Sequence, residues 1–420
     1  MGAVTTLKVF DHEDVAWFRD DVGLSSAARG AAATLARRVG LDSHRASEVA
    51  LAVTEAATNL HRHASDGALL LRVLRTANSA GVEFVTVDTG PGMTDVAQSL
   101  LDGTSTAGTL GIGLGALVRL ADAFDIHSIP GRGTVMAAQF WPRGLAPAGG
   151  ATAARPDTSV ASGVTRPISG ETSCGDAWAV RVDPGVDHDP RTGPAPGGPD
   201  TGRPATSRTL REGSAASRDP WTGTSFQSTY GGAIARDAYR STATAAPLPA
   251  LSPDPSLLVM LCDGLGHGPL AALASEAAVK AFRQSAARHP EGLLRDIHTA
   301  LRGTRGGAVA VARVEPSAGR LLFCGVGNVS GFLLTPDSRS GLLSAPGIVG
   351  QQMRSLRTFE LPLKPDSALV MHSDGLTERW TAADLPGLLR HSPAVVAGQL
   401  LREAAVRHDD AGIVVLKGAW

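Results

Sequence analysis

The stretch SLLVMLCDGLGHG (residues 256–268) is an unbroken apolar run that ends abruptly at Asp263, which is followed at once by a glycine. The same device returns in SALVMHSDGLTERW (residues 367–380), where the apolar run ends close to Asp374. An isolated Asp-Gly pair usually marks a turn. Two such pairs, each closing a strand that reads as buried, predict instead that carboxylates gather at strand ends.

Two more acidic positions stand beside apolar strands. Asp176 opens the alternating run in GDAWAV (residues 175–180), and Asp409 lies just before the last strand in RHDDAGIVVLKG (residues 407–418). Carboxylates that meet at strand ends repel one another, at a cost on the order of several kcal/mol, unless cations lie between them. Hard oxygen ligands without His or Cys select Mg²⁺ or Mn²⁺. We therefore predict a divalent metal site in this half of the chain.

Residues 169–420 resemble the metal-dependent PPM-type protein serine/threonine phosphatases of the SpoIIE and RsbX branch. The matching motifs occur in one ordered series: GDAWAV, DGLGHG, GVGNVSG, GIVG, SDGLTE and DDAGIVVL. The resemblance implies an α-β-β-α sandwich that hydrolyses phosphoserine, with Asp263 and Asp374 central to catalysis. It also implies two Mn²⁺ or Mg²⁺ ions, and the implied ligands are Asp176, Asp263, the carbonyl of Gly264, Asp374 and Asp409. Where relatives usually have Thr or Ser, this chain has Gly412, so we expect a local hydrogen bond to be missing.

The first part of the chain reads as a mixture of helices and strands. Apolar residues recur at helical spacing in residues 22–40 and 43–64, the second segment with Ser43 as a candidate N-cap. Apolar runs bounded by turn residues predict strands at residues 67–76, 81–90 and 133–141. We expect an α/β (α+β) layer with mixed strand pairing.

Polar residues and glycines mark a ligand site in this part. Glu55 and Asn59 are four residues apart, so they lie on one face of the predicted helix. Asp88 ends a strand and opens DTGPGM, where Gly90 and Gly92 permit close backbone approach. In TLGIGLGAL (residues 109–117), three glycines stand at the start of a helix, where free N–H groups favour phosphate. These three glycines are Gly111, Gly113 and Gly115.

Residues 5–141 resemble the GHKL (Bergerat) ATP-binding superfamily, and within it the serine kinase/anti-sigma factors of the RsbW and RsbT type. EAATN matches the N box, DTGPGM the first glycine box and GTLGIGLGAL the second. The resemblance implies that Glu55 acts as general base, Asn59 holds Mg²⁺, Asp88 reads the adenine, and the glycines of both boxes close over the phosphates of ATP. Residues 94–108 would form a mobile lid.

Length and composition indicate the number of domains and exclude some classes of function. A chain of 420 residues holds two domains. We place the ATP-binding domain at residues 1–142, a flexible linker at 143–168, and the phosphatase domain at 169–420 with a low-complexity insertion at about 183–255, inside the hairpin between the first two metal aspartates. With 39 Lys and Arg against 40 Asp and Glu, nucleic-acid binding is not expected. No leader or apolar run of about 20 residues stands out, so we expect a cytoplasmic protein without a membrane partner.

Together these features predict a serine kinase-like domain fused to a serine phosphatase. The resemblance suggests a STAS-domain anti-sigma-factor antagonist or a related phosphoprotein as substrate, a sigma factor or another switch protein as a further partner, and a homodimer as one assembly. Two alternatives stay open. The first part is a binding module that regulates the phosphatase without transferring phosphate, or the phosphatase half is a degenerate scaffold.

Overall fold

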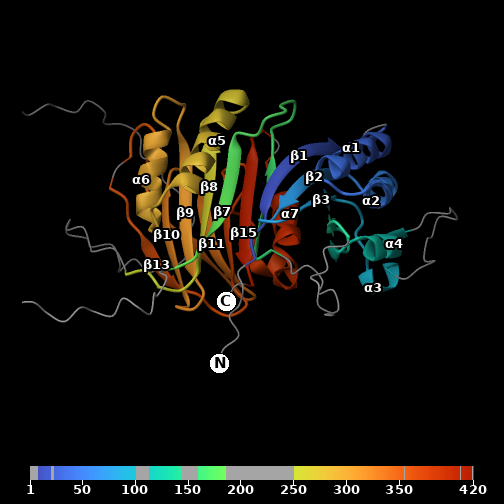
Figure 1. The fold of residues 1–420 in the computed structure, drawn as a ribbon. Helices are drawn as coiled ribbons and strands as arrows, with labels where there is room; N and C mark the ends of the chain where they lie inside the picture. Colours follow the sequence, from blue (N-terminus) through green and yellow to red (C-terminus); the bar gives the residue numbers. More distant parts are fainter. Residues whose placement is uncertain are drawn as a thin grey trace, which may run out of the picture. The chain divides into compact units, whose positions relative to one another are not determined.

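The computed structural model describes residues 8–19, 23–100, 113–143, 159–185, 250–353, 355–406, 408–418 and 420. Its first sheet has the strand order β1-β2-β3-β5-β4, and Figure 1 labels the first three of these strands. The strands of this sheet are β1 (Asp11–Arg19), β2 (Ala68–Arg75), β3 (Ala80–Val87), β4 (Ala123–Ile129) and β5 (Gly133–Phe140). The helices of this part are α1 (Leu24–Arg38), α2 (Ser43–His63), α3 (Val96–Ser99) and α4 (Gly113–Leu120).

Two further five-stranded sheets, both antiparallel, form the second part. The outer sheet, in the order β13-β10-β9-β8-β7, consists of β7 (Asp176–Asp183), β8 (Ser256–Gly264), β9 (Gly307–Glu315), β10 (Arg320–Val326) and β13 (Phe359–Pro362). The inner sheet, in the order β12-β11-β14-β15-β6, consists of β6 (Ala161–Arg166), β11 (Ser330–Thr335), β12 (Ser338–Leu342), β14 (Ala368–His372) and β15 (Ala411–Lys417). The helices are α5 (Pro269–Gln284), α6 (Pro290–Ala300) and α7 (Pro393–Ala404), with 3₁₀ turns at Ala382–Asp384 and Leu388–Arg390.

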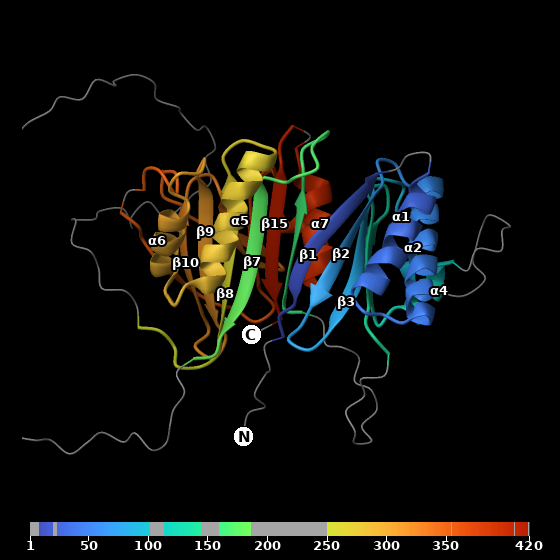
Figure 2. The ribbon, with the colours of Figure 1, turned by 45° about the horizontal axis from the view of Figure 1, so that its top comes forward.

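The layers follow from which faces are apolar. Helices α5 and α6 cover the outer sheet, the two sheets share a core, and α7 covers the inner sheet (Figure 2). This is the expected α-β-β-α sandwich. In the first part, α1 and α2 pack on one face of their sheet, as a GHKL-type α/β sandwich requires. No helix within the described ranges is long and apolar enough to span a bilayer.

The first part of the chain differs from its prediction in three ways, two in the sheet and one in helix α2. Every strand pair in the sheet is antiparallel, so the expected mixed pairing is wrong; short turns join β2 to β3 and β4 to β5. Strands β1 and β4 were not anticipated, because charged residues interrupt their apolar pattern. The N-cap of α2 is Asp42 and not Ser43, since the Asp42 carboxylate accepts a hydrogen bond from the backbone N–H of Arg45 (2.8 Å).

The predicted linker at 143–168 contains a strand. β6 pairs with β15 and so belongs to the inner sheet of the second part. The buried side chain of Arg72, on β2, donates hydrogen bonds to the carbonyl of Gly163 (2.6 Å) and the hydroxyl of Ser162 (2.9 Å). The described end of this segment, residues 159–168, is therefore in contact with both parts, and residues 144–158 lie outside the described residues. Most of the predicted insertion, residues 186–249, lies outside the described residues.

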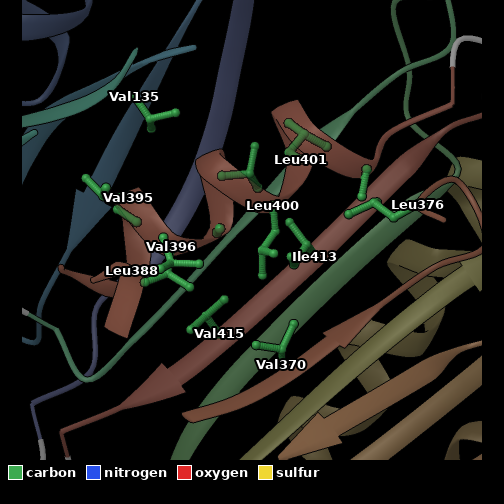
Figure 3. Packing of buried hydrophobic residues seen from close by; sticks show 14 of the residues in the cluster. Val135, Val370, Leu376, Leu388, Val395, Val396, Leu400, Leu401, Ile413 and Val415 are labelled. Carbon is green, nitrogen blue, oxygen red and sulfur yellow. The ribbon is translucent and has the colours of Figure 1, made fainter. Parts of the chain in front are cut away.

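Helix α7 packs on both sides (Figure 3). Its apolar side chains contact Val370, Ile413 and Val415 of the inner sheet and, within the same cluster, valines of β3 and β5. A Cβ at Gly398 would lie 2.9 Å from a Val135 methyl group. The backbone of the helix therefore lies so close to the first sheet at Gly398 that a residue with a side chain would not fit there without a shift.

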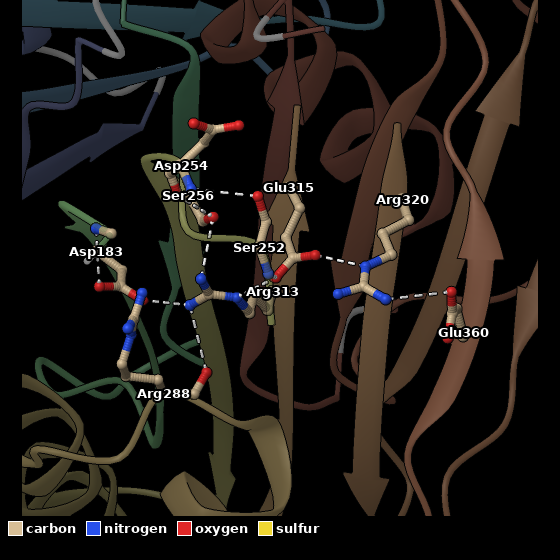
Figure 4. Close-up of polar contacts among 10 residues, drawn as sticks. Asp183, Ser252, Asp254, Ser256, Arg288, Arg313, Glu315, Arg320 and Glu360 are labelled. Atoms are coloured by element: carbon tan, nitrogen blue, oxygen red, sulfur yellow. Dashed lines mark hydrogen bonds and ion pairs between the residues drawn. The ribbon is translucent and has the colours of Figure 1, made fainter. Parts of the chain in front are cut away.

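A buried guanidinium ties the outer sheet together (Figure 4). Arg313 on β9 is fully buried and bonds to Glu315 (2.7 Å), Ser256 (3.1 Å) and the carboxylate of Asp183. These contacts compensate the desolvation of two carboxylates and one cation. They hold the hairpin of β7 and β8 to β9 at the end away from Asp176 and Asp263.

We expect Arg313→Ala to lower the free energy of unfolding by about 3 kcal/mol, because it removes the fully buried cation that Asp183 and Glu315 share and leaves each carboxylate only a more exposed arginine, Arg288 or Arg320. Urea unfolding followed by circular dichroism measures the change. The matched control is Arg283→Ala, which removes an exposed ion pair with Asp11 and is expected to cost no more than about 1 kcal/mol. Equal losses in the two variants would contradict the role given to Arg313.

Candidate functional site

Strand register brings the first two predicted metal residues face to face. In the antiparallel pair of β7 and β8, Asp176 lies directly opposite Asp263. Asp374 follows β14 in the inner sheet, and Asp409 lies two residues before β15, which pairs with β14. Electrostatic interactions link Asp176 and Asp263 to both of these carboxylates. The four aspartates singled out in the sequence therefore meet at one edge of the sandwich.

Burial of these carboxylates, together with their mutual repulsion, raises the pKa values of two of them. Burial, followed by the carboxylates of Asp176, Asp374 and Asp409, raises the pKa of Asp263 to about 9. Burial, then the carboxylates around it, also raises the pKa of Asp176 to about 7, although a hydrogen bond from Ser373 opposes the shift. Negative charges that penalise one another in this way are stabilised when cations lie between them. The donor set thus fits divalent cations that prefer oxygen ligands.

In their present rotamers the carboxylates bond to neighbouring groups. Asp263 shares a hydrogen bond with Asp374, and the Asn328 amide donates to the Asp374 carboxylate. Among the described residues, no three His, Cys, Asp or Glu side chains stand together as a ready-made metal-binding group. The sequence pattern did not indicate this contact, because 46 residues separate Asn328 from Asp374.

Ser373 supplies a polar contact beside Gly412. Its hydroxyl donates to Asp176 Oδ2 (2.5 Å) and accepts from the backbone N–H of Gly412 (2.9 Å). A Cβ at Gly412 would lie 2.8 Å from the Asp176 Cβ, so a larger residue does not fit there without a shift. Gly412 has no side-chain hydroxyl, and the hydroxyl of Ser373, just after the neighbouring strand β14, makes a hydrogen bond to Asp176 at this place.

Asp410 has a different role from Asp409. Its two carboxylate oxygens accept from the backbone N–H groups of Ile168 (2.7 Å) and Gly175 (2.8 Å), and it is buried. It therefore fixes the loop that leads into Asp176. A Cβ at Gly375 would collide with the Asp410 carbonyl oxygen, so the loop after Asp374 is pressed against the same residue.

We expect the metal-free chain to lose thermal stability as the pH rises from 5 to 9. The pKa values of Asp176 and Asp263, about 7 and about 9 in the folded chain, exceed the ordinary 3.8 of the unfolded chain. The folded state therefore binds more protons in this window, and stability falls as they leave. Melting temperatures in EDTA measure the effect.

Asp263→Asn is the control, because it removes the carboxyl with the larger shift and should flatten the pH profile. Mn²⁺ should raise the melting temperature most at high pH, where the carboxylates are ionised. A wild-type profile in EDTA no steeper than that of Asp263→Asn would contradict this account.

The second candidate site lies at the end of α2. Glu55 and Asn59 are partly buried on this helix, one turn apart. The loop after Asp88 packs against the end of the same helix, because the Thr89 N–H bonds to the Ser65 carbonyl (2.9 Å). The pKa of Asp88 is raised by partial burial, and its Oδ1 accepts from the N–H of Gly90 (2.8 Å).

Two glycines in the loop after Asp88 allow backbone segments around this site to lie in close contact. A Cβ at Gly90 would lie 2.6 Å from the carbonyl oxygen of His63, and a Cβ at Gly92, where φ is +64°, would lie 2.3 Å from that of Ile129. Gly113 and Gly115 fall in the first turn of α4, as predicted. Gly111 lies outside the described residues, as does most of the predicted lid at 94–108.

Comparison with known families finds two separate matches along the chain. Residues 18–140 match the histidine kinase-like ATPase domain. Residues 253–417 match stage II sporulation protein E, SpoIIE. The first match holds Glu55, Asn59 and Asp88, and the second holds Asp263, Asp374 and the last aspartate pair.

Individual relatives cover one half each. The serine/threonine-protein kinase RsbT of Bacillus subtilis (strain 168) is 32% identical over 28% of this chain and 88% of its own length. The phosphoserine phosphatase RsbX of the same strain is 26% identical over 29% of this chain and only 62% of its own length. The solved PP2C phosphatase domain of Bacillus subtilis SpoIIE, with a fragment of its regulatory domain, is 12% identical with a TM-score of 0.38, covering 80% of this chain and 79% of that one.

Proposed function

Because the chain belongs to the RsbT family of histidine kinase-like ATPases in its first part and to the SpoIIE phosphatase family in its second, we propose that it is a two-way phosphoserine switch. The second part removes phosphate from a protein serine, and the first part uses ATP to add it. The observation that carries the phosphatase is the meeting of four aspartates at one edge of the sandwich, where burial and the neighbouring carboxylates raise the pKa values of Asp176 and Asp263.

In the phosphatase half, Asp176, Asp263, Asp374, Asp409 and the Gly264 carbonyl would hold two Mn²⁺ or Mg²⁺ ions. When bound, such ions supply a water of lowered pKa and neutralise phosphate charge. The chain's own residues prepare the site. Ser373 fixes the orientation of Asp176, and Asn328 fixes that of Asp374. Asp374 is exposed, so a phosphoserine on a protein surface has access to this edge.

In the ATP-binding half, Asp88 would accept a hydrogen bond from the adenine amine, and Asn59 would hold Mg²⁺. ATP supplies the phosphoryl group, and positioning with charge neutralisation does most of the catalytic work. The backbone N–H groups at the start of α4, with Gly113 and Gly115, would face the phosphates. Glu55 would orient and deprotonate the acceptor serine.

The partner follows from the relatives by analogy. We propose a STAS-domain anti-sigma-factor antagonist as the serine-bearing substrate, within a circuit that controls a sigma factor, and a cytoplasmic location. Homodimer formation remains a prediction from the resemblance.

We expect the purified chain to release phosphate from a phosphoserine peptide with Mn²⁺ and not with EDTA. Asp263→Asn should lower the rate by about 100-fold or more, since it removes a ligand of the ions that stabilise the transition state. Phosphate is measured colorimetrically. The matched control Asp337→Asn changes an exposed aspartate in the turn after β11 and should keep the wild-type rate. Metal-independent release, or none from the folded wild type, would contradict the phosphatase and favour the scaffold.

Glu55→Gln should abolish phosphate transfer from ATP to a STAS-domain protein while the dissociation constant of ATP stays within about twofold, because a general base acts on the acceptor and not on the nucleotide. Radiolabelled transfer and calorimetry give the two readouts. Glu13→Gln, which alters an exposed carboxylate on β1, serves as the matched control. A wild type that binds ATP and transfers nothing would support the binding-module alternative.

A further inference from the structure

Helix α7 is part of the phosphatase sandwich, yet its other side faces the ATP-binding half. Val395 and Leu400 share one buried cluster with Val85, Val87 and Val135 of the first sheet. The absent side chain of Gly398 lets the helix backbone approach those valines. The helix is therefore a direct packing element of both halves.

Polar contacts fix the beginning and the middle of α7 to the same sheet. The Asp125 carboxylate, on β4, accepts from the backbone N–H of Ser392 (2.6 Å), the N-cap of α7, and lies 2.8 Å from His391 Nδ1. Further along the helix, Gln399 Oε1 lies 3.3 Å from His127 Nδ1. These contacts set the position of the helix along its axis.

The last turn of α7 reaches the proposed adenine residue. Arg402, whose side chain is 2% exposed, donates through Nη1 to the backbone carbonyl of Asp88 (3.2 Å) and to that of Arg132. Between these two carbonyls stands Gly133, with φ of +98°, where a Cβ would lie 2.6 Å from Arg402 Nη1. A cation from the phosphatase half thus holds the backbone from which the Asp88 carboxylate projects.

The same turn holds the loop of a proposed metal ligand. The backbone N–H of Thr377 bonds to the Ala404 carbonyl (2.8 Å), and that of Val406 bonds to the Gly375 carbonyl (2.8 Å). Gly375 directly follows Asp374, and Asp409 lies three residues beyond Val406. Displacement of the end of α7 would therefore move both metal loops and the Asp88 backbone together.

We propose that α7 couples the nucleotide site to the metal site, with Arg402 as the positioning residue that links the helix to Asp88. A metal ion held by Asp374 and Asp409 would restrain their loops and, through them, the end of α7, so that nucleotide would bind to an Asp88 backbone that Arg402 holds in place. Coupling of this kind is reciprocal, and nucleotide strengthens metal binding by the same factor. The inference rests on the two sites proposed above.

The test is a mutant cycle on the full chain. Calorimetry gives the dissociation constant of the non-hydrolysable ATP analogue AMP-PNP at saturating Mn²⁺ for wild type, Asp374→Asn, Arg402→Ala and the double variant. We expect Asp374→Asn to weaken AMP-PNP binding by about fivefold or more in the wild-type background. In the Arg402→Ala background the same change should have no effect, because the link is already cut.

Two controls separate coupling from general damage. Arg402→Lys keeps the charge but presents a single ammonium instead of the planar fork, and should retain part of the coupling. Arg302→Ala removes an exposed arginine after α6 and should retain all of it. Arg402→Lys also serves as the test should Arg402→Ala fail to fold.

The outcomes are distinct. A wild type that does not bind AMP-PNP overturns the proposed ATP site and the coupling with it. A wild type that binds AMP-PNP as tightly as Asp374→Asn leaves the proposed function standing and overturns the coupling. A fivefold effect of Asp374→Asn that persists in the Arg402→Ala background overturns the role of Arg402.

Discussion

Helix α7 is buried on all sides, so other elements have to pack against each of its faces. Ten of its twelve residues, from Pro393 to Leu401 and Ala404, are buried. The inner phosphatase sheet covers one side, and valines of β3 and β5 cover another. Removal of the first part would return those apolar surfaces to water. The two halves therefore share a core, although their sequences match different family models.

The edge at which Asp176, Asp263, Asp374 and Asp409 meet depends on a second constraint, which is the absence of side chains on the glycines beside them. Gly264, Gly375 and Gly412 each stand where a Cβ would collide with backbone or with Asp176. These close contacts bring strand ends near enough for four carboxylates to interact. The glycines beside the aspartates are thus required by packing at least as much as by turn geometry.

The sequence predicted features that depend on local pattern. Apolar strands that end in aspartate, and a helix with Glu55 and Asn59 one turn apart, are readable within a few residues. The partners of those residues are not. Ser373 and Asp176 are 197 residues apart, and Arg402 and Asp88 are 314 residues apart. Such contacts depend on how sheets are stacked, and the sequence pattern carries no record of that stacking. Strands β1 and β4 were missed for a related reason, since neighbouring layers accommodate their polar residues.

The register of β7 and β8 also has a practical meaning for protein engineering. The hairpin carries Asp176 opposite Asp263 at one end and Asp183 opposite Ser256 at the other, seven residues away, or about 23 Å along an extended strand. The chain leaves the described sandwich after Gly185 and re-enters at Ala250, beside that second end. Closure entropy grows only logarithmically with loop length. This hairpin end is therefore a suitable point at which to insert a reporter domain or to vary the chain length. The edge with the four aspartates and the site at the end of α2 should keep their geometry.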